Sequence, residues 1–510
     1  MTSRPQAIGV DLGRLVREFE SRSGLQEVEY EVKHRPDREA LIIKMANPTE
    51  RFYKLIETIT NGDDEEFPTI TLKKRAPNNR LQSPEARYFL RVLSESLNIN
   101  RFSFKEEFFE RYTKSVSNAE AQITALANHI VYGRRGAGKS SLLLYALRSR
   151  EARGLRSAWI DFQTYEKRND NKVVVSILSA ILDQLEPTIS NSPAYAATKH
   201  VMQRLEADTA LSDAMIRDLV PQVRRVLTDF VSAQRPLFIF LDDFHLLDMG
   251  MQPKFLGYLY SITRGNNVFV KLSAIETLTK SWDAVSRAGM QVPHDAQTIK
   301  LDYNLTMPDK AEKHIEGILD AHAVYCGLPS VRFLCTSNNV LSRLVWVSAG
   351  VPRDALNMFA QAITKAVTAG GSRVSVTNIN VAASDLVSQK IRDLEIDVLA
   401  PEAETDLEST LERIKDFCIK QQRKNAFLVE IRTDSELYRA AAKLVDLRLL
   451  HVISEGITVG DAGRKFLALI LDYGFYTGIR AAQSVDLFNK QTERVVYKDL
   501  RKLPIVPRNI

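Results

Sequence analysis

Short apolar runs and amphipathic segments alternate along the first part of the chain. The runs 40–45 and 69–72 predict strands, and the spacing of apolar residues in 50–60 and 84–97 predicts helices. We find no chemical motif among these residues. The pattern therefore predicts an N-terminal α+β domain over residues 1–115 and leaves its role open.

From residue 116 the apolar runs become continuous and alternate with helical segments. Five runs predict strands: 129–132, 157–162, 236–241, 268–272 and 298–301. The intervening helices include 213–233 and 279–288. A run without polar alternation is expected of a strand buried on both faces, and strand–helix alternation is typical of a parallel sheet with crossover helices. We therefore predict an α/β core over residues 116–303.

A glycine-rich motif follows the first run and opens a helix. It reads G-x-x-x-x-G-K-[ST] and comprises Gly133, Arg134, Arg135, Gly136, Ala137, Gly138, Lys139 and Ser140, with Ser141 next in the helix. Glycines let the backbone wrap an anion with several N–H groups at a helix N-terminus. Lys139 is then expected to reach the β- and γ-phosphates of ATP, and the hydroxyl of Ser140 to ligate Mg²⁺.

The strand predicted at 236–241 runs directly into two carboxylates. Doubly wound sheets place ligands at the carboxyl ends of their strands. Asp242 is therefore expected to hold Mg²⁺ through water, and Asp243 to orient or deprotonate the water that attacks the γ-phosphate. Taken alone, the two acids are equally typical of a turn that ends a strand, but the upstream phosphate-binding motif favours the catalytic interpretation.

Three further residues are candidates for contacting the γ-phosphate. Ser273 follows the run 268–272, where ring-forming ATPases place a polar residue, although a small residue leaving a strand is an equal alternative. Arg287, near the end of the helix predicted at 279–288, could offset transition-state charge in a neighbouring subunit. Arg264 competes for this role, and a surface arginine is the default interpretation of both.

Composition places the chain among soluble globular proteins. Apolar residues make up 45% and charged residues 26% of 510 positions, and this length suggests about three domains. No apolar run approaches the roughly 18 residues of a membrane span, and the N-terminus lacks the layout of a signal peptide. Cys326, Cys335 and Cys418 are too widely spaced to suggest zinc or redox chemistry. We expect a cytoplasmic protein that does not contact a membrane.

The charge balance leans only slightly towards nucleic acid. The chain has 69 basic and 63 acidic residues, a formal net charge of +6. One basic cluster holds Lys73, Lys74, Arg75 and Arg80, and a C-terminal cluster holds Lys490, Arg494, Lys498, Arg501, Lys502 and Arg508. Each is interpreted as solvated surface in preference to a binding site.

Beyond the core, residues 304–395 read as helical and carry the segment Gly350-Val-Pro352-Arg353. This segment resembles the second sensor of AAA+ ATPases, in the form found in the origin-recognition and replication-initiator clade. The resemblance implies a helical lid from which Arg353 reaches the γ-phosphate. An ion pair between Arg353 and Asp354 is the alternative.

After residue 402 a helix, a second helix and a hairpin pattern suggest the winged-helix domain that the same clade carries, extending to residue 510 with a basic tail. The resemblance implies that helix 435–446 enters the major groove of double-stranded DNA. Arg439, Lys443 and Arg448 would then lie near phosphates, with Glu455-Gly456 at the tip of the wing. Winged helices also contact proteins, which is the alternative.

Two features depart from the clade. The spacing from Lys139 to Asp242 is 103 residues (242 − 139), which implies an insertion near 187–212, and Ser273 replaces the customary Asn of the first sensor. Both departures leave ATP hydrolysis less secure than ATP binding.

Together these patterns predict a P-loop AAA+ ATPase core with a helical lid, a C-terminal winged helix and a separate N-terminal domain. We expect MgATP between core and lid to control DNA engagement or partner assembly, in a homo-oligomer or a complex with an effector protein. Bacterial genome defence or mobile-element control is a suggested setting. The alternative is a signalling NTPase of the STAND type whose winged helix contacts proteins.

Overall fold

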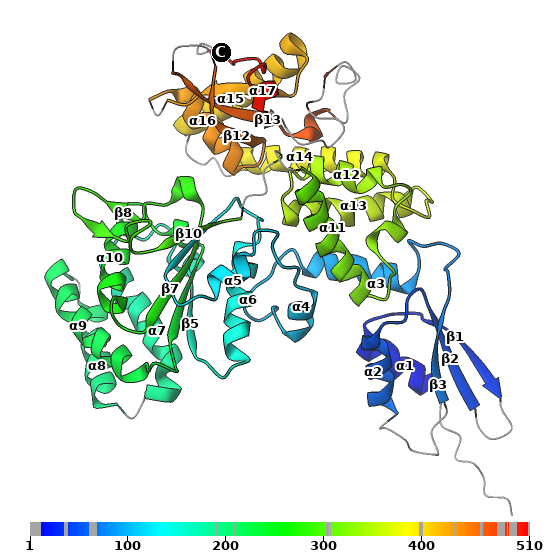
Figure 1. Cartoon of the computed structure of the whole chain (residues 1–510), viewed down its shortest axis with the longest axis horizontal. Coiled ribbons are helices and arrows are strands. Elements are labelled where there is room, and N and C mark those ends of the chain that lie inside the picture. Colours follow the sequence, from blue (N-terminus) through cyan, green and yellow to red (C-terminus); the bar gives the residue numbers. More distant parts are fainter. Residues whose placement is uncertain are drawn as a thin grey trace, which may run out of the picture. The chain divides into compact units, whose positions relative to one another are not determined.

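The computed structural model of the chain forms two compact units, which are described separately (Figure 1). One is Ile99–Asp302, and the other combines Met1–Asn98 with Tyr303–Ile510. The structure describes residues 12–34, 39–60, 69–189, 192–208, 210–301, 305, 308–396, 401–432, 434–459, 463–476, 485–486, 488 and 497–507.

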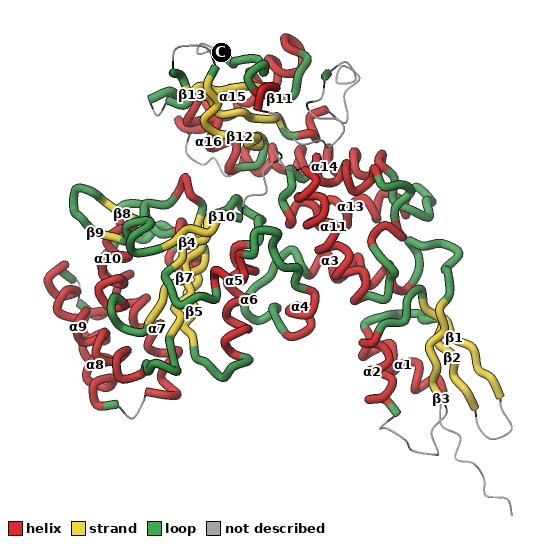
Figure 2. The backbone as a smooth tube through the Cα atoms, viewed as in Figure 1, coloured by secondary structure: helices red, strands yellow, loops and turns green. Residues whose placement is uncertain are grey.

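The unit Ile99–Asp302 contains the predicted parallel sheet (Figure 2). Its strand order is β10-β4-β7-β6-β5, and every neighbouring pair is parallel. The strands are β4 (His129–Tyr132), β5 (Ser157–Asp161), β6 (Leu237–Asp242), β7 (Val268–Ala274) and β10 (Gln297–Lys300). The predicted α/β core is therefore confirmed in its fold.

Two hydrophobic cores form on opposite faces of this sheet. Phe238 and Phe240 of β6 join a core with α6 (Lys139–Glu151), whereas Ile239 and Leu241 join a core with α7 (Lys172–Ile189). Successive strand side chains point to opposite faces, so burial on both faces accounts for the run without polar alternation. Helices α9 (Asp213–Phe230) and α10 (Met251–Thr263) complete the second core.

The long spacing between the phosphate-binding loop and Asp242 reflects an extra helix. Helix α8 (Pro193–Ala207) stands between α7 and α9, within the predicted insertion, and residues 190–191 and 209 lie outside the described residues. The hydroxyl of Ser192 caps α8 by accepting a hydrogen bond from the Tyr195 N–H. The insertion therefore adds helical surface on the sheet face covered by α7 and α9.

The helix predicted at 279–288 is wrong. The structure has a short hairpin there, with β8 (Trp282–Asp283) antiparallel to β9 (Ala288–Gly289). The Asp283 carboxylate accepts hydrogen bonds from the N–H and hydroxyl of Ser286, 2.9 and 2.5 Å away, which closes a tight turn. Such local bonds compete with helix formation, and they prevail here over an apolar spacing that resembles a helix.

The second unit begins with a small mixed sheet. Strand β1 (Glu29–His34) is antiparallel to β2 (Glu39–Met45), which is parallel to β3 (Thr69–Lys74). Three helices belong to the same segment: α1 (Leu12–Ser23), α2 (Glu50–Ile59) and α3 (Pro84–Glu95). The strands and helices expected in residues 40–97 are present.

This N-terminal segment does not form a core of its own. Its buried residues share one hydrophobic cluster with α11 (Pro308–Tyr325), α12 (Asn339–Val347), α13 (Pro352–Thr368) and α14 (Val376–Ile396). Phe89 packs edge-on against Phe359 with ring centroids 6.3 Å apart, and the Ser96 hydroxyl lies 3.0 Å from His322 Nε2. The expected separate N-terminal domain is thus structurally continuous with the expected lid.

The boundary expected at residue 115 also lies elsewhere. Residues from Ile99 belong with the parallel sheet, where Phe104 and Phe108 join the core of α6. They come from α4 (Glu106–Arg111) and the loop before it, and α5 (Ala119–Ile123) follows. These aromatic residues fix the segment to the unit that holds the phosphate-binding loop.

The C-terminal part pairs helices with a three-stranded antiparallel sheet of order β11-β13-β12. Its elements are α15 (Pro401–Asp416), which continues as a π-helical turn (Phe417–Gln422), then β11 (Ala426–Glu430), α16 (Glu436–Asp446), β12 (Leu450–Thr458), β13 (Lys465–Leu471) and α17 (Tyr497–Leu500). This arrangement is compatible with the predicted winged helix.

The predicted wing tip at Glu455-Gly456 is wrong. Both residues lie inside β12, where the pairing with β13 shifts register between Ser454 and Ile457. Gly456 has φ +70°, so a glycine-containing irregularity within the strand resembles a turn in the sequence. The hairpin connection falls between Thr458 and Lys465, and residues 460–462 of it lie outside the described residues.

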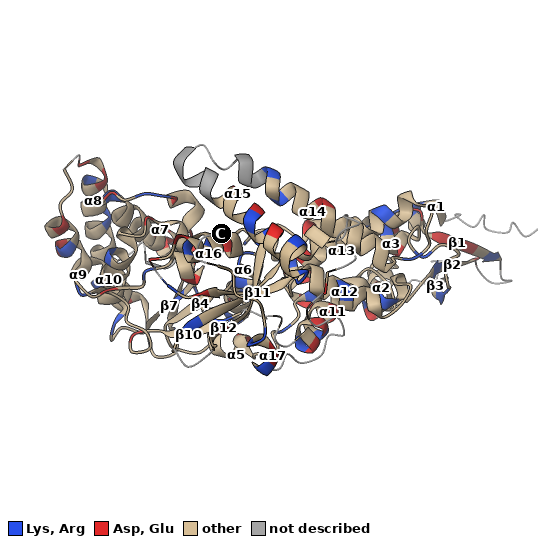
Figure 3. Ribbon diagram, turned by 90° about the horizontal axis from the view of Figure 1, so that it is seen from above, with Lys and Arg blue, Asp and Glu red and all other residues tan. Residues whose placement is uncertain are grey.

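Some members of the basic clusters are engaged within the fold, whereas Lys73, Lys74, Lys498 and Arg501 are exposed. Arg75 pairs with Glu29, and Arg80 donates to the Phe333 carbonyl at 2.9 Å. Lys502 pairs with Asp499 at 3.2 Å, while Lys490, Arg494 and Arg508 lie outside the described residues. Figure 3 shows mixing of signs along α11. Among the helices described, none is long and apolar enough to cross a membrane.

Candidate nucleotide-binding site

The glycine-rich loop connects β4 to α6, as its sequence predicts. Gly136 and Gly138 have φ of +85° and +94°, values that residues with a side chain rarely adopt. Gly133 has an ordinary φ, and a Cβ there would approach Ala137 Cβ to 3.2 Å. Two glycines therefore serve the backbone conformation and the third serves close packing.

Lys139 lies across this loop. Its Nζ donates to the carbonyls of Gly133 and Arg134 at 2.9 and 3.2 Å, and the residue is only 6% exposed. Among the other predicted loop residues, Arg135 is exposed and Ser141 is half-buried in the first turn of α6. The ammonium is thus held at the concave turn where phosphates are expected to bind.

Asp242, the last residue of β6, meets two hydroxyl groups from different elements. Ser140 donates to Asp242 Oδ1 at 3.1 Å from the first turn of α6, and Ser273 donates to the same oxygen at 2.5 Å from β7. Because parallel strands end at one edge of the sheet, residues separated by 102 and 31 positions converge there. The structure therefore brings both predicted metal ligands together.

The electrostatics of this cluster favour a cation. Burial, with the charge of Asp243 as the next cause, raises the pKa of Asp242 to about 6, although the hydrogen bonds from Ser273 and Ser140 oppose the shift. No lysine or arginine in the described part of the chain forms an ion pair with Asp242. A buried carboxylate surrounded by hydroxyl oxygens suits Mg²⁺, which prefers oxygen ligands, so the residues present fit this ion.

Asp243 stands at a strained turn beside Asp242. Its φ is +52° and ψ +42°, and its side chain is 40% exposed. The Asp243 N–H donates to Ser273 Oγ at 2.9 Å. A non-glycine residue in this region costs about 1–3 kcal/mol and persists where its surroundings hold it. Ser273 thus holds both acids at once.

This position changes the interpretation of Ser273. The residue is fully buried, and its hydroxyl donates to Asp242 while it accepts from the backbone of Asp243. The sequence predicts a direct contact of Ser273 with the γ-phosphate. The observed bonds give it an organising role within the acid pair, and a direct phosphate contact stays a prediction.

Two residues of this site escaped the sequence reasoning. Asp161 ends β5 directly opposite Asp242, and its charge contributes to the raised pKa of Asp242. His245 follows Asp243 in a single 3-10 turn, η2 (Phe244–Leu246), and its Nδ1 lies 4.0 Å from Asp243 Oδ1. The sequence signal for Asp161 is an acid at the end of a predicted strand. The sequence signal for His245 is its spacing from the two acids, Asp-Asp-x-His.

The candidate trans-acting arginines stand at less specific positions. Arg287 is exposed at the turn of the β8–β9 hairpin with φ +52°, not on a helix. Arg264 follows α10, where its carbonyl accepts a hydrogen bond from Arg224 at 2.7 Å. Neither position tests a role in a neighbouring subunit, so both stay predictions.

Arg353 and its surroundings belong to the other compact unit. Pro352 and Arg353 form the first turn of α13 after Gly350, which has φ +73°, and Arg353 is exposed. The neighbouring Asp354 is buried. The predicted turn is thus present, and the contact of Arg353 with a γ-phosphate stays a prediction.

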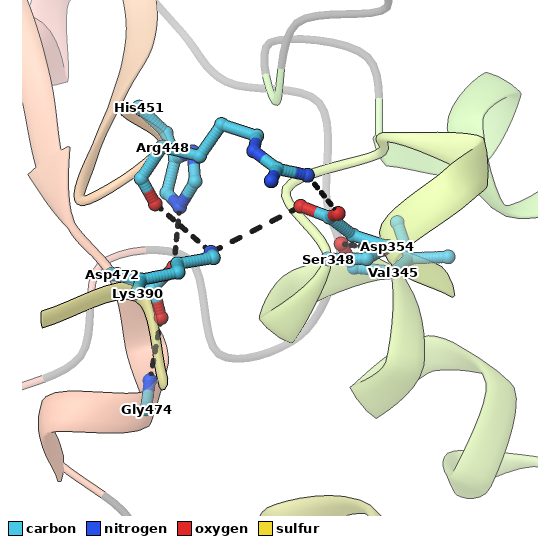
Figure 4. A network of polar contacts seen from close by, with 8 residues as sticks. All are labelled: Val345, Ser348, Asp354, Lys390, Arg448, His451, Asp472 and Gly474. Carbon is cyan, nitrogen blue, oxygen red and sulfur yellow. Dashed lines mark hydrogen bonds and ion pairs between the residues drawn. The ribbon is translucent and has the colours of Figure 1, made fainter. Parts of the chain in front are cut away.

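Asp354 takes part in a buried network of charges that joins α13 and α14 to the C-terminal domain (Figure 4). Arg448 forms an ion pair with Asp354, and Lys390 lies 3.9 Å from Asp354 and 3.0 Å from Asp472. His451 Nε2 lies 2.9 Å from the same Asp472 oxygen. The network connects the expected lid to the expected winged helix.

A DNA contact by Arg448 would require it to leave its ion pair with Asp354, so the contact stays a prediction. Its guanidinium is engaged by Asp354, and its side chain is 21% exposed. Arg448 follows α16 with φ +61°, so the end of the helix turns it towards the lid. Arg439 and Lys443, by contrast, are exposed one helical turn apart on α16.

A phosphate-binding loop on one strand and a buried acid on another, in a parallel sheet, define a P-loop nucleoside triphosphatase fold. Residues 119–270 match the family described as an AAA ATPase domain. The chain thus carries an AAA ATPase domain, and the predicted AAA+ class is confirmed. No curated protein matches the sequence.

Solved structures of origin-recognition proteins are similar to this chain. The Aeropyrum pernix ORC1 protein in complex with DNA is 14% identical over 73% of this chain and 92% of that chain, with a TM-score of 0.39. The ORC2 protein of the same organism in its ADPNP-ADP complexes is 14% identical over 84% of this chain and 96% of that chain, with a TM-score of 0.37. The Drosophila ORC bound to DNA is 13% identical over 85% of this chain and 98% of that chain, with a TM-score of 0.36.

Proposed function

We propose that this protein binds MgATP at the loop 133–140 and hydrolyses it. The observation that supports this most directly is the buried Asp242 carboxylate, which meets the hydroxyls of Ser140 and Ser273 beside the loop. Ser140 and Asp242 would hold Mg²⁺. When bound, this ion neutralises charge on the β- and γ-phosphates.

The protein's own residues would bind the phosphates, accept the proton of the attacking water and position the accepting carboxylate. The N–H groups of the loop and the Lys139 ammonium bind and orient the phosphates. Asp243, half-exposed beside the loop, accepts a proton from the attacking water. Ser273 holds Asp243 through its backbone N–H, so that the carboxylate projects from a fixed point.

Two substitutions test this proposal against a matched control. Lys139→Ala should abolish ATP binding measured by calorimetry, whereas Lys167→Ala, an exposed lysine of the same unit, should leave it unchanged. Asp243→Asn should keep ATP affinity and lower turnover by about 100-fold or more. Unchanged ATP affinity in Lys139→Ala would refute the site.

We further propose that the nucleotide state governs engagement of double-stranded DNA by the C-terminal domain, with Arg353 sensing the γ-phosphate. The support is the exposure of Arg439 and Lys443 on α16, together with the buried charge network that joins this domain to α13. A cation at the start of α13 that gains or loses a phosphate partner would bias the position of that helix.

DNA binding is tested by its salt dependence. Arg439→Ala and Lys443→Ala should each weaken binding and reduce the slope of log affinity against log salt by about 1. Lys420→Ala, which removes an exposed lysine outside α16, is the control. Arg353→Ala should abolish the effect of ATP on DNA affinity. Oligomer formation with ATP, measured by light scattering, tests the role of Arg287 in a neighbouring subunit.

A further inference from the structure

His245 is a buried imidazole with an unused hydrogen-bonding atom at the proposed ATP site. Its side chain is 10% exposed, and among the described residues its Nδ1 has no hydrogen-bond partner. A buried polar atom without a partner destabilises the fold, so such atoms in folded proteins are rare. The Oδ1 atom of Asp243 lies 4.0 Å from Nδ1.

The backbone around His245 is fixed on both sides. Phe244 packs edge-on against Phe162 with ring centroids 5.1 Å apart and is fully buried. The carbonyl of Leu246 accepts a hydrogen bond from the Lys167 N–H at 2.8 Å. The turn that carries His245 is therefore anchored to η1 (Phe162–Tyr165), which follows the neighbouring strand β5, and to Lys167 just after it. Its imidazole stands at a set position beside Asp243.

The surroundings of His245 keep its imidazole neutral. Burial lowers the pKa of His245 to about 4; Asp243 opposes this shift, and the positive charges of Lys139 and Arg135 add to it. At neutral pH the ring therefore carries a single N–H. A neutral donor can orient a carboxylate through a hydrogen bond. A cation at the same place would lower the pKa of Asp243 and make it a weaker base.

We propose that His245 is a positioning residue for Asp243: its Nδ1–H donates to Asp243 Oδ1 and orients the carboxylate towards the attacking water. This inference rests on the proposed role of Asp243 in ATP hydrolysis. The proposed bond requires the half-exposed Asp243 side chain to rotate, so that the 4.0 Å separation shortens to hydrogen-bonding distance. Ser273 then fixes the backbone of Asp243, and His245 fixes its carboxylate.

Substitutions by Asn and Gln can identify which imidazole nitrogen of His245 donates to Asp243. The side-chain N–H₂ of Asn lies at the position of the His Nδ1, whereas that of Gln lies near Nε2. His245→Asn should therefore keep turnover within about 3-fold of the unsubstituted chain. His245→Gln and His245→Leu should lower kcat by about 10- to 100-fold. KM and ATP affinity should change less than about 2-fold in all three, because the ground state is bound elsewhere.

These outcomes separate positioning from a structural role. A structural role would lower thermal stability and ATP affinity together and would not distinguish Asn from Gln. If His245→Gln keeps turnover and His245→Asn loses it, Nε2 is the working atom and the proposal is overturned. If His245→Leu does not fold, the comparison of Asn with Gln still decides the question.

Combining substitutions separates this inference from the proposed function. In an Asp243→Asn background, His245→Leu should cause no further loss of turnover, because the two residues act as one unit. If Asp243→Asn hydrolyses ATP normally, the proposed function fails. If Asp243→Asn is inactive while His245→Leu turns over like the unsubstituted chain, only the positioning role fails.

Discussion

Two buried aspartates of this protein have opposite electrostatic surroundings. At the end of β6, the described hydrogen-bond partners of the Asp242 side chain are two hydroxyls; burial, with two further acids nearby, raises its pKa to about 6. Asp472 follows β13 and is completely buried. Burial alone would raise the pKa of Asp472, but the charge of Lys390 and the hydrogen bond from His451 lower it to about 2.

The difference distinguishes a ligand site from a structural network. Asp472 has its compensating charge within the fold, from Lys390 at 3.0 Å. Among the described residues no lysine or arginine pairs with Asp242, and its hydroxyl neighbours suit a bound cation. A buried acid whose charge is not compensated by the protein is destabilising unless a cation arrives, so the direction of the pKa shift indicates which kind of site an acid serves.

The largest effect is expected at the structural network. Asp472→Asn removes the acid closest to the buried Lys390, which keeps only the more distant Asp354 at 3.9 Å among its described partners, and takes away the charged partner of His451. It should lower the free energy of unfolding by about 3–5 kcal/mol in urea denaturation. Asp385→Asn removes an exposed partner of Lys365 and should cost less than about 1 kcal/mol. Equal effects would mean that burial does not distinguish these ion pairs.

The same substitution at Asp242 should raise the free energy of unfolding instead of lowering it. Asn keeps an oxygen that accepts from Ser140 and Ser273 but removes the uncompensated charge. Asp242→Asn should therefore stabilise the ligand-free protein by about 1–2 kcal/mol, measured by the same denaturation. It should also abolish the stabilisation that Mg²⁺ adds to ATP. A loss of stability similar to that of Asp472→Asn would contradict the comparison.

The two acids should also differ in the pH dependence of stability. The folded pKa of Asp242 lies above its ordinary value of 3.8, so ionisation costs stability as pH rises from about 4 to 6. The advantage of Asp242→Asn should therefore grow across this window and stay constant above it. The folded pKa of Asp472 lies below 3.8, so its contribution is complete above that pH and is lost as pH falls towards 2. Denaturant titrations at several pH values check both signs.

The smallest effect concerns Arg448, whose charge is already engaged by Asp354. Arg448→Ala should leave the salt slope of DNA binding unchanged, whereas Arg439→Ala should reduce it by about 1. Fluorescence anisotropy with a duplex at several salt concentrations measures both slopes. An equal reduction in both variants would show that Arg448 leaves Asp354 when DNA binds.

Local patterns predicted the features that depend on neighbouring residues. The phosphate-binding loop, the buried β6 and the acids at its end follow from short motifs, and the order of strands and helices in the core follows from apolar runs. The hairpin at 282–289 was missed because a side-chain turn prevailed over apolar spacing.

Features that depend on distant residues were not predictable in this way. Arg448 pairs with an acid 94 positions away, and Lys390 with one 82 positions away. The shared core of α3 and α13 likewise joins segments on either side of the ATPase unit. Nothing in the sequence around Arg448 distinguishes a phosphate ligand from a partner of a buried acid, because the packing of the chain decides between them.

The discontinuous unit has a consequence for how this protein is made. Helices α1 to α3 are synthesised before the helices that cover their apolar faces, and the 204 residues of Ile99–Asp302 lie between the two groups. At about 5–20 residues per second, these faces wait roughly 10–40 s on the ribosome for their partners. During that interval the ATPase unit can fold on its own contacts, while Phe89 and its neighbours stay exposed to chaperones and to other nascent chains. We therefore expect the unit Ile99–Asp302 to complete its folding before the N-terminal helices gain their packing partners.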